Sequence, residues 1–372
     1  MDQQTFTNIS KILASDAKAT TYKFALLRGT IDLITDNSPF ITIVDKRANF
    51  PLGLLIKKWL LYYFPLTDIP QIRGKTDLAF NRHLKLLTDY YKSRGGISVF
   101  HNDLTSLGIP NEISHTFLAV AKQLAKTITG MPMRYIGNSL NQEEYSIFNY
   151  QPSSFVSKIA MQLDTEYLIE RFGTFSIPLE YYKAFQVLGS FISGQDAILF
   201  KWAEFSAQAS GKNFSINAVL NEILKSPVTE RQIFNAKRFY EELHRKDGKM
   251  RCVWSGKSIV SYNIDHVIPF AVWKNNDLWN LLPADASVNK TKSDKIPTPK
   301  LIENQRELIV DYWNILNNHF GQPFRKEIQT ALLGYNKYTN WQDQAIEQLK
   351  LTCHTLITIR GFDSWDYSMG NR

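Results

Sequence analysis

The chain has 372 residues, of which 44% are hydrophobic and 21% are charged, and its formal net charge is +8. This composition excludes a disordered or fibrous chain, and the length favours two or three domains. The positive charge concentrates in residues 237–300, which hold 12 Lys and Arg against 7 Asp and Glu, a net charge of +5. A polyanionic partner is therefore favoured.

Cysteine use and the apolar segments point to the compartment. Cys252 and Cys353 lie far apart and form no disulfide framework, which predicts a reducing, cytoplasmic setting. The N-terminus lacks the basic and apolar regions of a signal peptide. The most apolar run, residues 51–66, is interrupted by Lys57 and Lys58 and is too short to cross a bilayer. We therefore expect no membrane association.

The first 130 residues carry apolar side chains at helical spacing, separated by turn residues rich in Asp, Asn, Ser, Pro and Gly. Thr20 and Thr21 precede the first such segment and are available to cap it. The pattern predicts helices over residues 22–35, 51–64, 78–92 and 112–128.

The middle of the chain is less regular. β-Branched and aromatic residues in segments 147–155 and 172–178 predict a short hairpin or a sheet edge. This stretch, residues 130–175, is where the helical region can divide into two subdomains. Helical spacing then resumes over residues 179–192, 197–210, 229–244, 300–320, 324–333 and 341–359.

These elements predict a mainly α fold with a small embedded α+β unit. We expect a helical region over residues 1–240 that serves recognition, regulation or oligomerisation. A ββα unit is expected over residues 245–300, and a helical C-terminal region over residues 301–372.

The segment from residue 250 to residue 298 carries the candidate chemistry. Asp265 and His266 are adjacent, Asn280 follows 14 residues after His266, and Asn289 follows 23 residues after it. Segments 252–260 and 261–269 read as two strands, and a short helix over residues 284–294, stopped by Pro297, presents Asn289. Such a unit brings Asp265 and Asn289 together.

Each of these side chains suits one step of phosphodiester hydrolysis. His266 can take a proton from water near neutral pH. A carboxylate and an amide oxygen, from Asp265 and Asn289, suit a single hard cation that neutralises phosphate charge. We expect Asp265 to be exposed, so that its removal leaves folding nearly intact.

The combination of DH-x-x-P, the loop asparagine and the N-x-x-K-S-D helix resembles the HNH endonuclease family with its ββα-metal fold. The last histidine of the family motif is asparagine here, as in the similar HNH domain of CRISPR effector nucleases. The resemblance implies that His266 is the general base and that Asp265 and Asn289 bind Mg²⁺, for which Mn²⁺ can substitute. It also implies that Asn280 pins the loop through hydrogen bonds to backbone groups.

The resemblance further implies that Lys292 faces a phosphate, and Lys290 and Arg251 are the other candidate phosphate contacts. Lys290 is equally compatible with a solvated helix face on which it pairs with Asp294. The paired Cys-x-x-Cys ligands of many relatives are missing, so we expect no structural zinc. The unit is instead expected to pack around Trp254, Val260, Ile264, Trp273, Trp279 and Leu281.

The leading hypothesis is a magnesium-dependent DNA endonuclease in restriction or anti-phage defence, with DNA as its main partner. A second copy of the chain or a defence-system protein is a further candidate partner. The alternatives are an inactive nucleic-acid-binding or interaction protein that has kept the ββα fold, and an RNase or nickase of the same family.

Overall fold

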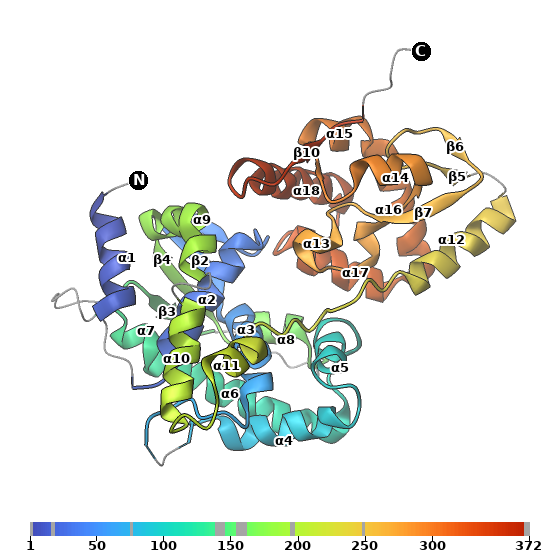
Figure 1. Cartoon of the computed structure of the whole chain (residues 1–372). Helices are drawn as coiled ribbons and strands as arrows, with labels where there is room; N and C mark the ends of the chain where they lie inside the picture. Colours follow the sequence, from blue (N-terminus) through green and yellow to red (C-terminus); the bar gives the residue numbers. More distant parts are fainter. Residues whose placement is uncertain are drawn as a thin grey trace. The chain divides into compact units, whose positions relative to one another are not determined.

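The computed structural model describes residues 3–15, 19–74, 77–137, 146–153, 162–193, 198–247 and 250–367. The chain forms two compact units, Met1–Pro227 and Val228–Arg372 (Figure 1). Helices dominate both units, and the sheets are small. The predicted class, mainly α with a small α+β unit, agrees with this architecture. The boundary lies 13 residues before the expected one, and residues 301–372 belong to the same unit as the expected ββα segment.

The N-terminal unit is built around buried helices, and its first predicted helix has the expected bounds. Thr21 does not cap that helix with its side chain, because its hydroxyl pairs with the Tyr63 hydroxyl at 2.9 Å. The helices are α1 (Gln3–Ser15), α2 (Tyr22–Thr35), α3 (Leu52–Tyr63), α4 (Asn81–Lys92), α5 (Ile97–Asn102), α6 (Ser114–Gly130), α7 (Pro132–Tyr135), α8 (Thr165–Arg171), α9 (Leu179–Ser193), α10 (Phe200–Ala209) and α11 (Ile216–Ile223).

A four-stranded antiparallel sheet of order β1-β2-β4-β3 crosses this unit. The pairing of β3 with β4 confirms the predicted hairpin or sheet edge, although residues 154–155 of that prediction lie outside the described residues. The hairpin of β1 and β2 was not predicted; Asp45 and Lys46 form its turn with positive φ angles of 48° and 58°. The strands are β1 (Thr42–Val44), β2 (Arg47–Pro51), β3 (Asn149–Gln151) and β4 (Thr174–Pro178).

The C-terminal unit has one continuous core shared by the expected ββα segment and the helices that follow it. Trp279 and Trp313 are fully buried there, and the Trp313 indole N–H donates to the Trp279 carbonyl at 2.8 Å. The elements are α12 (Phe234–Asp247), β5 (Met250–Arg251), β6 (Ser258–Ile259), β7 (Tyr262–His266), α13 (Phe270–Trp273), β8 (Leu281–Asp285), α14 (Ala286–Lys292), β9 (Ile296–Pro297), α15 (Pro299–Asn304), α16 (Arg306–Phe320), α17 (Gln322–Ile328), α18 (Trp341–Thr358) and β10 (Ser364–Trp365).

Strand pairing in this unit differs from the prediction. Strand β7 pairs with β8, whose residues were expected to lie in a loop and at the start of the helix. The predicted first strand, residues 252–260, is wrong, because β5 and β6 form a separate short hairpin around a turn. The ββα unit is therefore β7, β8 and α14, which contact one another. Figure 1 shows β7 and α14 next to each other.

Two further predictions are also corrected here. Val260 is 89% exposed and takes no part in the core, since it falls between β6 and β7. Helix α14 ends at Lys292 rather than at residue 294, because Ser293 adopts a positive φ of 54° that breaks the helical path. Cys252 is wholly buried in the core of this unit.

Candidate active site of the C-terminal unit

Strand β7 carries both Asp265 and His266 at its end. Asp265 lies opposite Leu282 and His266 lies opposite Leu281 in the antiparallel ladder with β8. Adjacent residues of a strand point to opposite faces, so the two side chains diverge from one strand end. Both are nearly inaccessible, with Asp265 5% and His266 4% exposed. The expectation of an exposed Asp265 is therefore wrong.

Asn280 closes the loop between the two strands. Its side-chain Oδ1 accepts a hydrogen bond from the Ile268 N–H at 2.8 Å, and its Nδ2 donates to the Ile268 carbonyl at 3.1 Å. Its own carbonyl accepts from the Val267 N–H at 2.8 Å. Because Asn280 is fully buried, these bonds meet no competition from water. They hold the chain directly after His266, the kind of main-chain contact expected from the sequence.

The Asp265 carboxylate is surrounded by donors. The Lys292 ammonium lies 3.1 Å from Asp265 Oδ1, and the Trp254 indole N–H donates to Oδ2 at 2.6 Å. Burial raises the pKa of Asp265, and the nearby Lys292 and Trp254 act in the opposite direction. Trp254 was expected only as a core residue, so its hydrogen bond to the carboxylate is a contact that periodicity does not reveal.

Lys292 is placed differently from the expectation. Its side chain is completely buried, and its ammonium also donates to the His266 carbonyl at 2.6 Å. The resemblance implied a lysine that faces a phosphate, whereas in this structure the ammonium contacts Asp265. The reason is the reach of the lysine side chain, which extends from α14 across to the end of β7.

The other two basic candidates are exposed. Lys290 lies on the outer side of α14, and Arg251 lies at the end of β5. The Arg251 guanidinium donates to the Gly256 carbonyl at 2.8 Å and so supports the β5–β6 turn. Both remain accessible to a phosphate.

Helix α14 begins at a well-formed cap. Asp285 Oδ1 accepts hydrogen bonds from the N–H groups of Ser287, at 2.9 Å, and Val288, at 3.2 Å. Hydrogen bonding to Ser287 lowers the pKa of Asp285. Asn289 is half-buried and precedes Lys292 by three residues, so both lie on one face of the helix. Since Lys292 reaches Asp265, that face is turned towards the end of β7.

The His266 imidazole is held by a neighbouring asparagine. Its Nε2 lies 3.1 Å from Asn276 Oδ1, and the Phe270 ring packs nearby with its centroid 5.6 Å away. Burial lowers the pKa of His266 to about 4, while the hydrogen bond to Asn276 acts in the opposite direction. The imidazole is therefore neutral at pH 7 and able to accept a proton. Asn276 was not singled out in the sequence, where its only signal is the turn-rich run Asn275-Asn276-Asp277.

The donor set at this site suits a hard divalent cation through a carboxylate and an amide oxygen, from Asp265 and Asn289. Within the part of the chain that the structure describes, no group of three or more His, Cys, Asp or Glu side chains is arranged to hold a metal ion. A cation at Asp265 would therefore take its other ligands from water and phosphate. It would also have to displace the Lys292 ammonium from the carboxylate.

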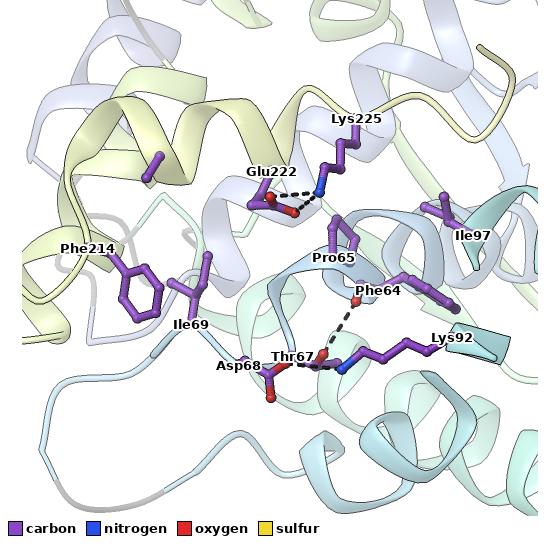
Figure 2. A pocket seen from close by; sticks show the side chains of 11 residues that line it. Phe64, Pro65, Thr67, Asp68, Ile69, Lys92, Ile97, Phe214, Glu222 and Lys225 are labelled. Atoms are coloured by element: carbon purple, nitrogen blue, oxygen red, sulfur yellow. Dashed lines mark hydrogen bonds and ion pairs between the residues drawn. The ribbon is translucent and has the colours of Figure 1, made fainter. Parts of the chain in front are cut away.

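The N-terminal unit contains a cavity of about 470 Å³. Figure 2 shows two lysines on its walls, each beside a carboxylate. Lys92 Nζ lies 3.1 Å from Asp68 Oδ2, and Lys225 Nζ lies 2.6 Å from Glu222 Oε2. Because each ammonium is already paired, the walls present no excess charge to select an ionic ligand. The candidate catalytic residues, Asp265 and His266, lie in the other unit.

Two different family models match the chain, one in each unit. A family model described as Domain of unknown function (DUF8808) matches residues 2–223, which is 222 of the 372 residues. The chain belongs to the DUF8808 family. The matched residues fall within the N-terminal unit, which ends at Pro227. In this member of the DUF8808 family, a model of the HNH endonucleases matches residues 252–298. That range contains β7, β8 and α14, and with them Asp265, His266, Asn280 and Asn289.

No curated protein and no solved structure matches the chain. The closer likeness to the HNH domain of CRISPR effector nucleases thus stays a prediction. Among the described residues, no helix has the length and apolar character needed to cross a membrane.

Proposed function

We propose that this chain is a metal-dependent endonuclease that hydrolyses phosphodiester bonds in DNA. The observation that carries the proposal is that Asp265 and His266 lie at the end of β7 and that α14, the helix that carries Asn289, packs against β7 and β8 and contacts Asp265 through Lys292. This arrangement occurs within the residues that match the HNH endonuclease family. A carboxylate, a neutral imidazole and an amide on one small scaffold are the groups that hydrolysis of a phosphodiester requires.

In the proposed mechanism, His266 is the general base. Its imidazole is uncharged at neutral pH and takes a proton from the attacking water. Asn280 keeps the base in place by holding the main chain at Ile268. Asp265 and Asn289 are the proposed ligands of Mg²⁺, or of Mn²⁺ in its place. When bound, this cation neutralises charge on the phosphate and on the departing oxygen.

Charge supports a nucleic-acid substrate. Residues 237–300 carry a net charge of +5, and this range contains the whole ββα unit. Lys290 and Arg251 are exposed beside that unit and are the proposed phosphate contacts. Binding through such contacts weakens steeply as salt is added. The affinity for DNA, measured at several salt concentrations, therefore tests this part of the proposal.

Plasmid cleavage tests the proposal. Supercoiled plasmid is incubated with the full-length chain and MgCl₂, beside His266→Ala and the surface control His354→Ala. Cleavage by the wild type and by His354→Ala, with loss in His266→Ala, is the expected result. Identical behaviour of the wild type and His266→Ala would show that this site does not cut DNA. Conversion to open circle alone indicates a nickase, and a parallel assay on single-stranded RNA tests the RNase alternative.

One observation favours the second candidate, an inactive ββα unit kept for nucleic-acid binding or protein interaction. The carboxylate proposed to bind the cation already has an ammonium 3.1 Å away. If Mn²⁺ fails to bind the wild type but binds Lys292→Met, the lysine blocks the site and the inactive candidate is correct. Binding of Mn²⁺ to the wild type supports the nuclease.

The role in restriction or anti-phage defence rests on the family resemblance alone. The N-terminal DUF8808 unit is proposed to serve recognition, regulation or oligomerisation, through a second copy of the chain or a defence-system protein. Light scattering of the purified chain measures its mass in solution and so tests whether it binds a second copy of itself. Phage plating on cells that express the wild type or His266→Ala tests the defence role.

A further inference from the structure

Asn276 joins the proposed base to a segment outside the residues that match the HNH family. Its Oδ1 lies 3.1 Å from His266 Nε2 and accepts a hydrogen bond from the Gln232 N–H at 3.2 Å. Its Nδ2 donates to the Glu230 carbonyl at 2.9 Å. The HNH match begins at residue 252, so both main-chain partners precede it by about twenty residues.

These contacts determine which way the Asn276 amide faces. A main-chain carbonyl can only accept, so the atom facing Glu230 must be the NH₂ group. A main-chain N–H can only donate, so the atom facing Gln232 must be the amide oxygen. The two contacts agree, and the oxygen is therefore also the atom that faces His266.

The orientation of the amide in turn determines the tautomer of the imidazole. An amide oxygen accepts hydrogen bonds and cannot donate, so His266 Nε2 must carry the hydrogen. In the neutral ring the lone pair is then on Nδ1. The ring position is also restricted, because His266 is only 4% exposed and packs beside Phe270.

We propose that Asn276, oriented by the main chain of Glu230 and Gln232, is a positioning residue that holds His266 with Nε2 protonated and Nδ1 free to accept a proton. The inference rests on the proposed function for the role of His266 as a base, and it extends that site to the segment that precedes α12. These residues follow directly after the boundary between the two units, at Pro227 and Val228. A complete nuclease site thus includes residues 230–232.

The first experiment reads the tautomer without requiring activity. The full-length, metal-free chain is labelled with ¹⁵N-histidine, and long-range ¹H–¹⁵N correlation spectra are recorded at pH 7.5, with His266 assigned from His266→Gln. The expected wild-type spectrum shows protonated Nε2 and unprotonated Nδ1. Asn276→Leu, which removes both polar atoms at similar size, is expected to give a mixture of tautomers. Asn276→Asp keeps the acceptor oxygen and is expected to retain the wild-type tautomer.

The matched control is Asn275→Leu. Asn275 lies in the same loop, but its side chain pairs with Asp277 at 2.7 Å and does not contact His266. We expect it to leave the tautomer unchanged. A wild-type tautomer in Asn276→Leu, or an equal change in Asn275→Leu, would overturn the proposal.

A second pair of variants tests the segment itself. Gln232→Pro removes the main-chain N–H that Asn276 Oδ1 accepts, whereas Gln232→Ala keeps it and changes only an exposed side chain. The expected result is a disturbed His266 tautomer in Gln232→Pro and a normal one in Gln232→Ala. Equal spectra from the two would contradict a role for this segment, provided that circular dichroism shows both variants folded.

Activity then separates failure of this inference from failure of the proposed function. Where plasmid cleavage is measurable, Asn276→Leu is expected to lower kcat by about 10- to 100-fold with little change in KM, because the base is misdirected rather than the substrate released. A tautomer change with no cleavage by the wild type supports the positioning role and refutes the nuclease. Wild-type kcat in Asn276→Leu refutes the positioning role while leaving the nuclease in place.

Discussion

Lys292 and Asp265 form a buried ion pair at the centre of the candidate active site. The ammonium lies 3.1 Å from the carboxylate, 27 residues away in the sequence, and neither side chain is more than 6% exposed. A cation in this position satisfies the same carboxylate that a divalent metal would need. The stability of the unit and the proposed binding of a metal are therefore linked through one pair of side chains.

Removing the lysine should destabilise the metal-free protein. Lys292→Met leaves the Asp265 carboxylate buried without its positive partner, which typically costs about 3–5 kcal/mol. Urea denaturation of the metal-free chain measures this loss, with the exposed Lys300→Met as the control. Mn²⁺ should restore more stability to Lys292→Met than to the wild type, because the carboxylate no longer has a competing ammonium. Equal stabilisation of both proteins by Mn²⁺ would rule out competition at Asp265.

Removing the carboxylate should also destabilise the fold, contrary to the expectation for an exposed ligand. Asp265→Ala leaves the Lys292 ammonium buried and takes an acceptor from the Trp254 indole. We expect a loss of about 3 kcal/mol or more. The double variant Asp265→Ala/Lys292→Met should recover part of it, because no unpaired charge remains. A double-mutant cycle in urea provides the coupling energy; strictly additive losses would mean that the pair does not interact.

Asn280→Ala should damage the loop that follows the base. Two side-chain hydrogen bonds to Ile268 are lost, and the buried main-chain groups at that residue remain unpaired. The expected cost is about 2–6 kcal/mol, since each of the two unsatisfied buried groups costs about 1–3 kcal/mol. Hydrogen exchange at the Ile268 amide reports the local effect. Unchanged protection there would contradict the clamp, whatever the effect on activity.

The stability of the C-terminal unit should depend on pH through His266. Its folded-state pKa of about 4 lies below the ordinary value of 6.5, so the unfolded chain binds this proton more tightly. The stabilisation is fully present above about pH 6.5 and is lost as the pH falls towards 4, a change of about 3 kcal/mol by linkage. Asp265, whose pKa is raised, acts in the opposite direction.

The measurement is the free energy of unfolding of the metal-free chain between pH 4.5 and 7.5, by urea denaturation. His266→Gln cannot gain this proton, so its stability should fall less steeply with decreasing pH. The difference between the two curves isolates the histidine from other titrating groups. Parallel curves would show that His266 is not held in its neutral form by burial.

Local patterns predicted much of the secondary structure. Helix α2 has the predicted bounds, residues 22–35, because apolar spacing and a preceding turn are both local signals. Helix α12 begins at Phe234 rather than at Thr229, since the preceding main chain is engaged by Asn276 instead of by a helical turn. The β1–β2 hairpin was not predicted because its strands are short and its turn pair, Asp45-Lys46, lacks the glycine that is typical of a two-residue turn with positive φ angles.

Residue type and spacing were enough to identify the candidate site residues, because the order of Asp265, His266, Asn280 and Asn289 can be seen in the sequence itself. The surroundings of these residues became known only from the tertiary structure. Asp265 is buried beside the Lys292 ammonium and the Trp254 indole, and Asn276 forms a hydrogen bond with His266. Spacing limits which residues can share a helix face or strand end. It does not specify which long side chain from another element fills the space between them, because that depends on packing between segments far apart in the chain.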